Sequence, residues 1–209
     1  MTVATKPETR SGALEAIYQR RAVRDYLPTP VPQETIQALL DAAVQAPTAM
    51  HLEPWSFVII QDPARLKRYS DRAKALLAKG TPSHEGLLKV AGVSESDAHL
   101  ARLLADPGFN IFYNARTLIV VCGKPMGSFV TADCWLAAEN LMLAATSLKL
   151  ASCCIGFAIP MLNTPGVKSE LNIPAEVSAV AAIIVGFPTG TTPPVPRRAP
   201  EILKWLKET

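Results

Sequence analysis

The stretch TLIVVCGKPMGSFVTADCWLAAENLMLAATSLKL, residues 117–150, decides the fold. Its first seven residues form an unbroken apolar run, which is typical of a β-strand covered on both faces. From about residue 129 onward, apolar side chains recur every three or four positions and charged ones are few. This pattern predicts a long helix with other elements on most of its sides. Together the two patterns predict a buried sheet beside a central helix.

Strand and helix signals alternate on both sides of this stretch. Runs rich in β-branched and aromatic residues predict strands at 55–61 and 177–188. Helical periodicity and end signals predict helices at 32–45, 62–80 and 163–174. The residues directly after the central helix carry no strand signal, so we expect a loop there.

Three segments do not follow this alternation. Residues 81–110 are weakly periodic and are expected to form short helices or a covering segment. Residues 189–200 are rich in proline, which suits neither helix nor sheet, so they are expected to run extended and to cross onto a partner. Residues 201–208 predict one last amphipathic helical turn or two.

Length, composition and charge limit the classes of function. The 209 residues, 49% of them hydrophobic, are expected to form one domain (1–209) with a flexible N-terminus at about 1–12 and an extended C-terminal arm at about 189–209. The net charge of +3 is spread among acidic residues, so no nucleic-acid partner is expected. The N-terminus lacks the apolar core of a signal peptide, and polar residues interrupt the most apolar stretch. We therefore expect a cytoplasmic protein without membrane contact.

Cysteine, histidine and glycine patterns argue against several common sites. The four cysteines lie in apolar surroundings, form no CxxC pair and have no metal-ligand spacing to the three histidines. Reduced, buried thiols and no metal site are therefore expected. No GxGxxG follows a strand, and neither GxxxxGK[ST] nor GxSxG occurs. The usual backbone cradles for dinucleotides and triphosphates are missing.

Five arginines form two clusters near opposite ends of the chain. They are Arg20, Arg21 and Arg24 in QRRAVRDY, and Arg197 and Arg198 in PPVPRRAP. If the fold brings both clusters together, a phosphate monoester is their natural partner, because guanidinium groups bind phosphate oxygens in pairs. Alternatively, both clusters are solvated, and the first is placed favourably at a helix C-terminus. Spacing alone leaves both interpretations open.

Four segments resemble, in the same order, motifs of the nitroreductase family of FMN-dependent oxidoreductases. RRAVRDY resembles the phosphate-binding motif RRSxRxF, and APTAMHLEPWSFVII resembles APSSxNxQPWxFVV. DCWLAAENLMLAATSLKLASCCIG resembles DxxxAAxNLxLAAxxLGLGSCWIG, and VAAIIVGFP followed by PPVPRR resembles the last strand and basic tail. The resemblance covers nearly the entire chain.

The resemblance implies an α+β fold with three layers, in which helices flank a mixed central β-sheet. It also implies a homodimer whose C-terminal arms are exchanged between subunits. Two FMN molecules would lie at the subunit interface, each held by residues of both chains. A single phosphate on FMN is consistent with the missing glycine-rich loop.

The same resemblance implies which residues hold FMN. Arginines of both clusters would neutralise the phosphate, residues 47–49 of the partner subunit would line the isoalloxazine, and residues 154–156 would present backbone N–H groups to the flavin. The implied cofactor-binding residues are Arg20, Arg21, Ala22, Arg24, Pro47, Thr48, Ala49, His51, Cys154, Ile155, Gly156, Arg197 and Arg198. Cys153 and Cys154 are expected to pack beneath the flavin rather than to act as redox groups, because adjacent cysteines rarely form an unstrained disulfide.

Three positions depart from the family pattern. The motif serine is Ala22, which removes one hydroxyl donor, and the Asn and Gln of NxQPW are His51 and Glu53. An ionised Glu53 would oppose the negative charge of the reduced flavin and a protonated His51 would favour it, so the pair is expected to tune the redox potential. The alternative is that both side chains turn outward and pair with each other or with solvent.

The resemblance implies that NADH or NADPH reduces bound FMN, leaves, and is replaced by a nitroaromatic, quinone or similar flat small molecule in a ping-pong reaction. No side-chain acid or base is required. Other flavin chemistry remains open, either as a dehydrogenase or oxidase or as a dehalogenase. So does a flavin-binding protein without turnover. Residues 81–116 are expected to form the variable wall of the pocket, with Phe109, Phe112 and Tyr113 among its aromatic residues.

Overall fold

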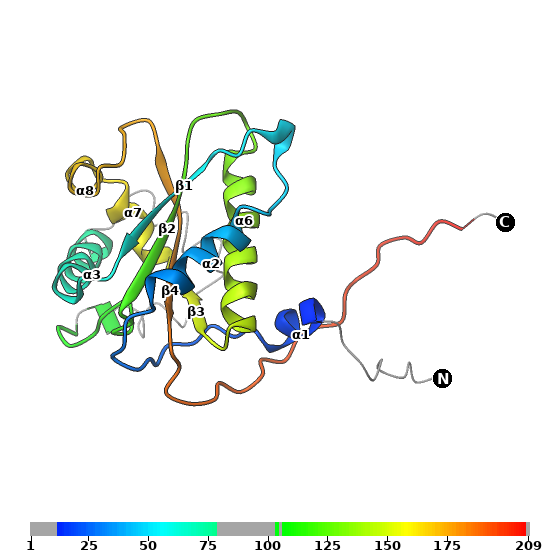
Figure 1. The fold of residues 1–209 in the computed structure, drawn as a ribbon, viewed down its shortest axis with the longest axis horizontal. Coiled ribbons are helices and arrows are strands. Elements are labelled where there is room, and N and C mark those ends of the chain that lie inside the picture. The colour runs from blue at the N-terminus through cyan, green and yellow to red at the C-terminus, as the bar shows by residue number, and fades with distance from the viewer. Residues whose placement is uncertain (1–11, 79–102, 105, 208–209) are drawn as a thin grey trace.

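The computed structural model describes residues 12–78, 103–104 and 106–207. Its centre is a four-stranded antiparallel sheet with the strand order β1-β2-β4-β3 (Figure 1). The strands are β1 (Trp55–Ile60), β2 (Thr117–Gly123), β3 (Ala151–Cys154) and β4 (Ser178–Gly186). Every residue of β2 is buried, which confirms the prediction of a strand covered on both faces.

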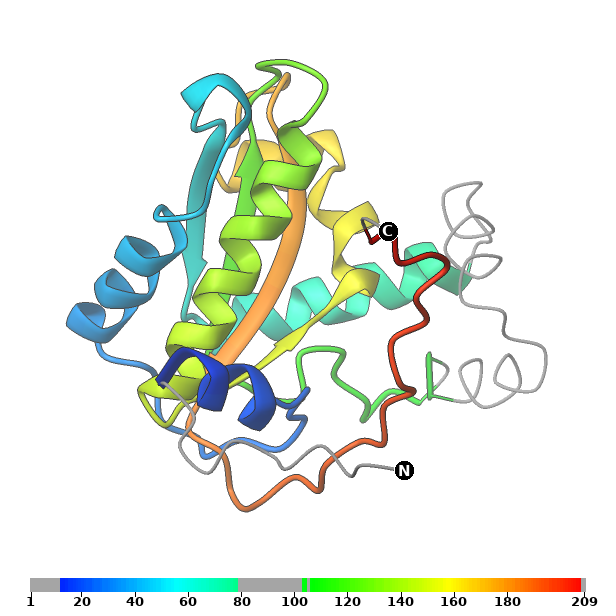
Figure 2. The ribbon, with the colours of Figure 1, turned by 90° about the vertical axis from the view of Figure 1, so that its right-hand side faces the viewer.

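Helices cover both faces of the sheet and give the protein three layers. They are α1 (Gly12–Gln19), α2 (Gln33–Ala43), α3 (Pro63–Ala78), α6 (Val130–Ser147), α7 (Ile159–Leu162) and α8 (Pro165–Glu170). α2 and α6 cover one face, whereas α3 and α7 cover the other (Figure 1, Figure 2). The α+β class and the layered arrangement are therefore confirmed.

Alternate residues of β2 build the two cores. Leu118 and Val120 belong to the core that includes Leu66 of α3. Ile119 and Val121 belong to the core that includes Leu141 of α6. This alternation follows from the two-residue period of a strand. Because α6 is packed along the sheet, the chain that leaves it returns directly to the sheet edge as β3.

Most predicted elements are confirmed within a few residues. The predicted strands at 55–61 and 177–188 are β1 and β4, and the predicted helices at 32–45 and 62–80 are α2 and α3. The last two residues of the second predicted helix, 79–80, lie outside the described part of the chain. The central helix is α6. The helix expected at 163–174 is shorter, because α8 ends at Glu170.

The expectation of a loop after the central helix is wrong, because β3 forms there and pairs with β4 at the edge of the sheet. Its four residues, ASCC, include no β-branched or aromatic side chain and so give no strand signal. The four strands are antiparallel throughout rather than mixed. Within the described residues, the parallel pairing is confined to an isolated bridge between Ala22 and Ser152.

The C-terminal segment leaves the sheet after β4 and runs away from the body of the protein (Figure 1). Residues 189–200 form neither helix nor strand, as predicted. The amphipathic turn expected at 201–208 is wrong for 201–207, which are not helical. A helix of one or two turns is unstable unless it packs against a surface. The segments 1–11 and 79–102, where a flexible terminus and a covering segment were expected, lie outside the described residues.

Candidate functional site

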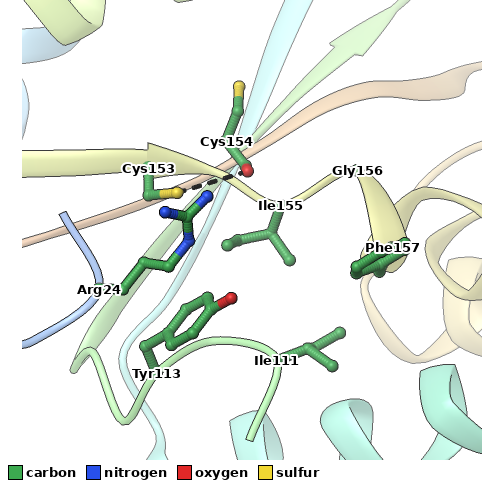
Figure 3. Close-up of a pocket in the computed structure, with 8 residues that line it drawn as sticks. All are labelled: Arg24, Ile111, Tyr113, Cys153, Cys154, Ile155, Gly156 and Phe157. Atoms are coloured by element: carbon green, nitrogen blue, oxygen red, sulfur yellow. Dashed lines mark hydrogen bonds between the residues drawn. The ribbon is translucent and has the colours of Figure 1, made fainter. Parts of the chain in front are cut away.

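A pocket with a volume of about 200 Å³ opens where β3 ends (Figure 3). Three segments line it: the arginine-rich stretch after α1, the loop before β2, and the turn that follows β3. The lining residues are Arg24, Ile111, Tyr113, Cys153, Cys154, Ile155, Gly156 and Phe157. The pocket therefore joins a cationic side chain to the residues implied for the flavin ring.

The turn after β3 supplies the backbone wall of the pocket. The Ile155 N–H donates to the Ala182 carbonyl of β4 at 2.8 Å, so the chain stays attached to the sheet as β3 ends. A single 3-10 turn, η2 (Gly156–Ala158), then leads into α7. Because Ile155 is buried, the change from strand to turn is fixed at this point. The backbone of 154–156 is thus held at the pocket by the sheet itself.

The arginine-rich stretch lies beside β3. The Val23 N–H donates to the Ser152 carbonyl at 3.1 Å, next to the Ala22–Ser152 bridge. This pairing places the Arg24 guanidinium above the pocket, where its Cζ lies 5.7 Å from the centre of the Tyr113 ring (Figure 3). Within the described ranges, Arg24 forms no ion pair with a carboxylate. Its charge is free to meet a ligand anion.

The other two arginines of this cluster are only partly compensated. Arg20 Nε lies 3.4 Å from Glu139 Oε1 of α6. Arg21 Nη1 donates to the carbonyls of Tyr18 and Arg20 at 2.7 and 2.8 Å, whereas its buried Nε has no hydrogen-bond partner among the residues described. Among the described residues, Arg20 is therefore the one member of the three that has a carboxylate within ion-pair distance. This surplus of donors fits a phosphate monoester.

The remaining predicted residues lie outside this pocket in a single chain. The segment 47–51 lies near α6, where the Ala49 N–H donates to Asp133 Oδ1 at 3.3 Å. Arg197 and Arg198 are exposed on the C-terminal segment, and in the described chain neither forms an ion pair. One chain thus brings Arg24 to residues 154–156, whereas Arg197 and Arg198 do not line this pocket.

The segment after Thr48 has an unusual backbone. Met50, His51 and Glu53 have φ angles of 56°, 53° and 45°, in the left-handed region that non-glycine residues rarely adopt. The Glu53 N–H donates to Thr48 Oγ1 at 3.4 Å across this turn. His51 and Glu53 are both exposed. Backbone strain of this kind is concentrated at functional sites, where the surrounding contacts maintain it.

Cys153 and Cys154 belong to opposite faces of the sheet. Cys153 is part of the α3-side core, whereas Cys154 packs against the α6-side core. Burial raises the pKa of the Cys154 thiol to about 11, and it also raises the pKa of Cys153. Both side chains are therefore neutral thiols near pH 7. This arrangement fits the expected packing role and disfavours a disulfide between them.

The structure separates the aromatic residues that sequence reasoning could not tell apart. Phe112 is fully buried in the core, whereas its neighbour Tyr113 lines the pocket. Phe109 contacts Tyr113 edge to face, with ring centres 5.7 Å apart. Sequence reasoning missed Ile111 and Phe157 as lining residues, because an apolar side chain at a pocket has the same sequence signal as one in a core.

Two further observations concern the described residues. Across the described ranges, no helix has both the length and the apolar character needed to cross a membrane. In the same ranges, no group of three or more His, Cys, Asp or Glu side chains is arranged to hold a metal ion. The polar side-chain groups that line the pocket at the end of β3 are the Arg24 guanidinium, the Tyr113 hydroxyl and the thiols of Cys153 and Cys154.

Comparison with known proteins identifies the family. The model of the nitroreductase family matches residues 17–187, which include the arginine-rich stretch, the pocket and the whole sheet. The chain belongs to the nitroreductase family.

Nitroreductase-family relatives match most of the chain. An NADH dehydrogenase from Thermus thermophilus is 27% identical over 84% of this chain and 86% of its own. A nitrobenzene nitroreductase from Ectopseudomonas oleovorans is 28% identical over 86% of this chain and 88% of its own. Among solved structures, a nitroreductase with bound FMN from Bacteroides fragilis has a TM-score of 0.76 and 27% identity, covering 95% of this chain and 100% of that one.

Proposed function

We propose that this chain is an FMN-dependent oxidoreductase that uses NADH or NADPH to reduce a nitroaromatic, a quinone or a similarly flat acceptor in a ping-pong reaction. FMN supplies, when bound, the ability to take up and pass on hydride. The observation that carries the proposal is the convergence of Arg24 and residues 154–156 on one pocket. The bound FMN and the NADH dehydrogenase and nitroreductase activities named for relatives support it.

The chain's own residues have separate tasks in this proposal. Arg24, with Arg20 and Arg21, binds the phosphate, and the unpartnered Arg21 Nε supports this assignment. Backbone N–H groups of Cys154 and Gly156 orient the flavin ring, whereas the Ile155 N–H, which the motif also implied for this role, is already bonded to the Ala182 carbonyl. Cys154 contributes packing only, because its pKa of about 11 keeps the thiol protonated. No side-chain acid or base is needed, since orientation and exclusion of water suffice.

The acceptor stacks in a slot whose wall is largely apolar. Ile111 and Phe157 provide its aliphatic and aromatic surface (Figure 3). Flat aromatic molecules gain contact area in such a slot and need few polar partners. Alternative flavin chemistry, as a dehydrogenase, oxidase or dehalogenase, would use the same slot. A flavin-binding protein without turnover would lack the reduction step altogether.

A second copy of the chain completes the site. Large apolar side chains are exposed on α1, on α6 and on the C-terminal segment, which supports a homodimer. They include Ile17, Phe129, Trp135, Leu203 and Trp205. In this arrangement the partner contributes Pro47, Thr48, Ala49 and His51, and exchanged arms bring Arg197 and Arg198 to the phosphate. Both groups lie outside the pocket within one chain.

The proposal is tested with purified, FMN-reconstituted protein under anaerobic conditions. NADH or NADPH is expected to bleach the flavin absorbance within seconds, and nitrobenzene or benzoquinone to restore it. Full bleaching before any acceptor is added supports the ping-pong order. Binding of FMN without bleaching would identify a flavin-binding protein. Bleaching that only other substrates reverse would favour the alternative flavin chemistries.

A further inference from the structure

We propose that Tyr113 is a positioning residue: its ring holds the Arg24 guanidinium over the pocket before FMN binds. The inference rests on the proposed function. Arg24 Cζ lies 5.7 Å from the ring centre, within the range of a cation–π contact. Arg24 has no carboxylate partner in the described part of the chain, so the contact with the Tyr113 ring is what orients its charge. Figure 3 shows the two side chains packed at one side of the pocket.

The loop that carries Tyr113 is fastened to α3 by buried polar groups. Lys74, which is only 7% exposed, donates from Nζ to the carbonyls of Asp106 and Phe109 at 3.0 and 2.7 Å. Ser70, which is fully buried, accepts a hydrogen bond from the Ile111 N–H at 3.0 Å. Leaving a buried ammonium group without hydrogen-bond acceptors destabilises the folded protein strongly, so these carbonyls are held close to Lys74. These contacts fix the loop on both sides of residue 110.

Within the loop, further contacts set the direction of the Tyr113 side chain. Tyr113 and Asn114 have φ angles of 50° and 56°, in the left-handed region. Asn110 accepts from the Phe112 N–H at 2.9 Å and donates to Asn114 Oδ1 at 3.2 Å, which closes the turn around them. Phe109 supports the Tyr113 ring edge to face at an interplanar angle of 79°. A strained turn retained by so many contacts indicates that the placement of this side chain matters.

The physical consequence concerns the cost of binding. A free arginine side chain has many rotamers, and ordering it around a phosphate costs conformational entropy. Arg24 held on a fixed ring has already lost part of that freedom. The face of the ring provides the attraction, so the ring is required and the hydroxyl is not. Tyr113 therefore acts on the phosphate end of the ligand, through Arg24, rather than on the flavin ring.

The test compares FMN with riboflavin, which lacks the phosphate. Binding of both to the full-length apoprotein is measured by quenching of flavin fluorescence in wild type, Tyr113→Phe and Tyr113→Leu. We expect Tyr113→Phe to match wild type within about two-fold, and Tyr113→Leu to weaken FMN by about three- to ten-fold. Riboflavin affinity is expected to be the same in all three. Circular dichroism checks that each variant folds, and Tyr113→Met replaces Tyr113→Leu if that variant does not.

A double-mutant cycle with Arg24→Gln distinguishes an effect of Tyr113 through Arg24 from a merely structural role of Tyr113. If Tyr113 acts through Arg24, Tyr113→Leu costs no further FMN affinity in the Arg24→Gln background. Equal losses for FMN and riboflavin, or additive losses in the cycle, would overturn the inference. So would an unchanged FMN affinity in Tyr113→Leu. Failure of wild type to bind either flavin would instead overturn the proposed function.

Discussion

Two regions of the molecule carry the proposed site, and they differ in how they are held. The anchored half, residues 106–116 with 153–157, is fixed by α3, by β4 and by its own side chains. The exposed half, residues 47–53 with 191–207, has few contacts with the rest of the chain: Met50 is 88% exposed and Trp205 is 70% exposed. In the proposed dimer, this difference means that one chain supplies only part of the site. The exposed half is the surface that a second copy would cover in the proposed dimer.

Deletion of the C-terminal arm, which belongs to the exposed half, is expected to have the largest effect on FMN binding. Deletion of residues 191–209 removes Arg197, Arg198 and the exposed apolar side chains of the arm. Two lost charge-assisted contacts predict at least about 100-fold weaker FMN binding, together with loss of the dimer. Size-exclusion chromatography with light scattering and flavin fluorescence measure the two effects.

The double variant Arg197→Gln/Arg198→Gln is the matched control for this deletion. It keeps the apolar arm, so we expect the dimer to persist while FMN binding weakens. A truncated chain that binds FMN as tightly as wild type would show that the exposed half is not part of the site.

Arg24→Gln tests the arginine that the anchored half holds over the pocket. Loss of its charge-assisted contact to phosphate predicts about 10- to 100-fold weaker FMN binding and little change for riboflavin. Arg116→Gln is the matched control, because Arg116 is a half-buried arginine at a different cavity. Equal effects of the two substitutions on FMN affinity would place the phosphate elsewhere.

Lys74→Met tests how much the hydrogen bonds of Lys74 stabilise the anchored half. The substitution leaves two loop carbonyls without their buried donor, which predicts a loss of about 2–3 kcal/mol in the free energy of unfolding. Lys67→Met is the control: Lys67 forms an exposed ion pair with Asp71, so about 0.5 kcal/mol is expected. Urea denaturation followed by circular dichroism measures both. Similar losses for the two variants would mean that the loop is not held by Lys74.

Glu53→Gln is expected to give the smallest effect. If the partner's exposed half meets the flavin, removal of this negative charge favours the reduced, anionic form and raises the FMN midpoint potential by about 10–30 mV. Spectroelectrochemical titration against a dye of known potential measures the shift. His51→Asn is the companion variant and should lower the potential where the imidazole is protonated. Unchanged potentials in both would support the outward orientation of these side chains.

The elements that sequence predicts well are those with long, regular patterns. β2, β4 and α6 are identified by unbroken apolar runs or helical periodicity, because burial on defined faces imposes those patterns. β3 escapes prediction because its strand character comes from pairing with β4 rather than from its residue types. The helical turn predicted at 201–208 fails for a related reason, since amphipathic sequence needs a surface to fold against.

The candidate site likewise contains residues that the sequence predicts and residues that it does not. The motif resemblance singled out Arg24 and residues 154–156, which line one pocket in the structure. Spacing alone could not decide between a phosphate site and solvated charges. Tyr113 could not be distinguished from Phe112, because adjacent aromatic residues have the same sequence signal and only the left-handed turn at 113–114 assigns one to the pocket and the other to the core. The bridge that places Arg24 beside β3 also depends on tertiary pairing.

The separation of Arg197 and the segment 47–51 from the pocket within one chain has a consequence for how the protein behaves in solution. If subunit association and cofactor retention share these residues, they form one linked equilibrium governed by mass action. Dilution would then release flavin as well as separate subunits, and added flavin would draw subunits together. The fraction of working protein would rise with its own concentration.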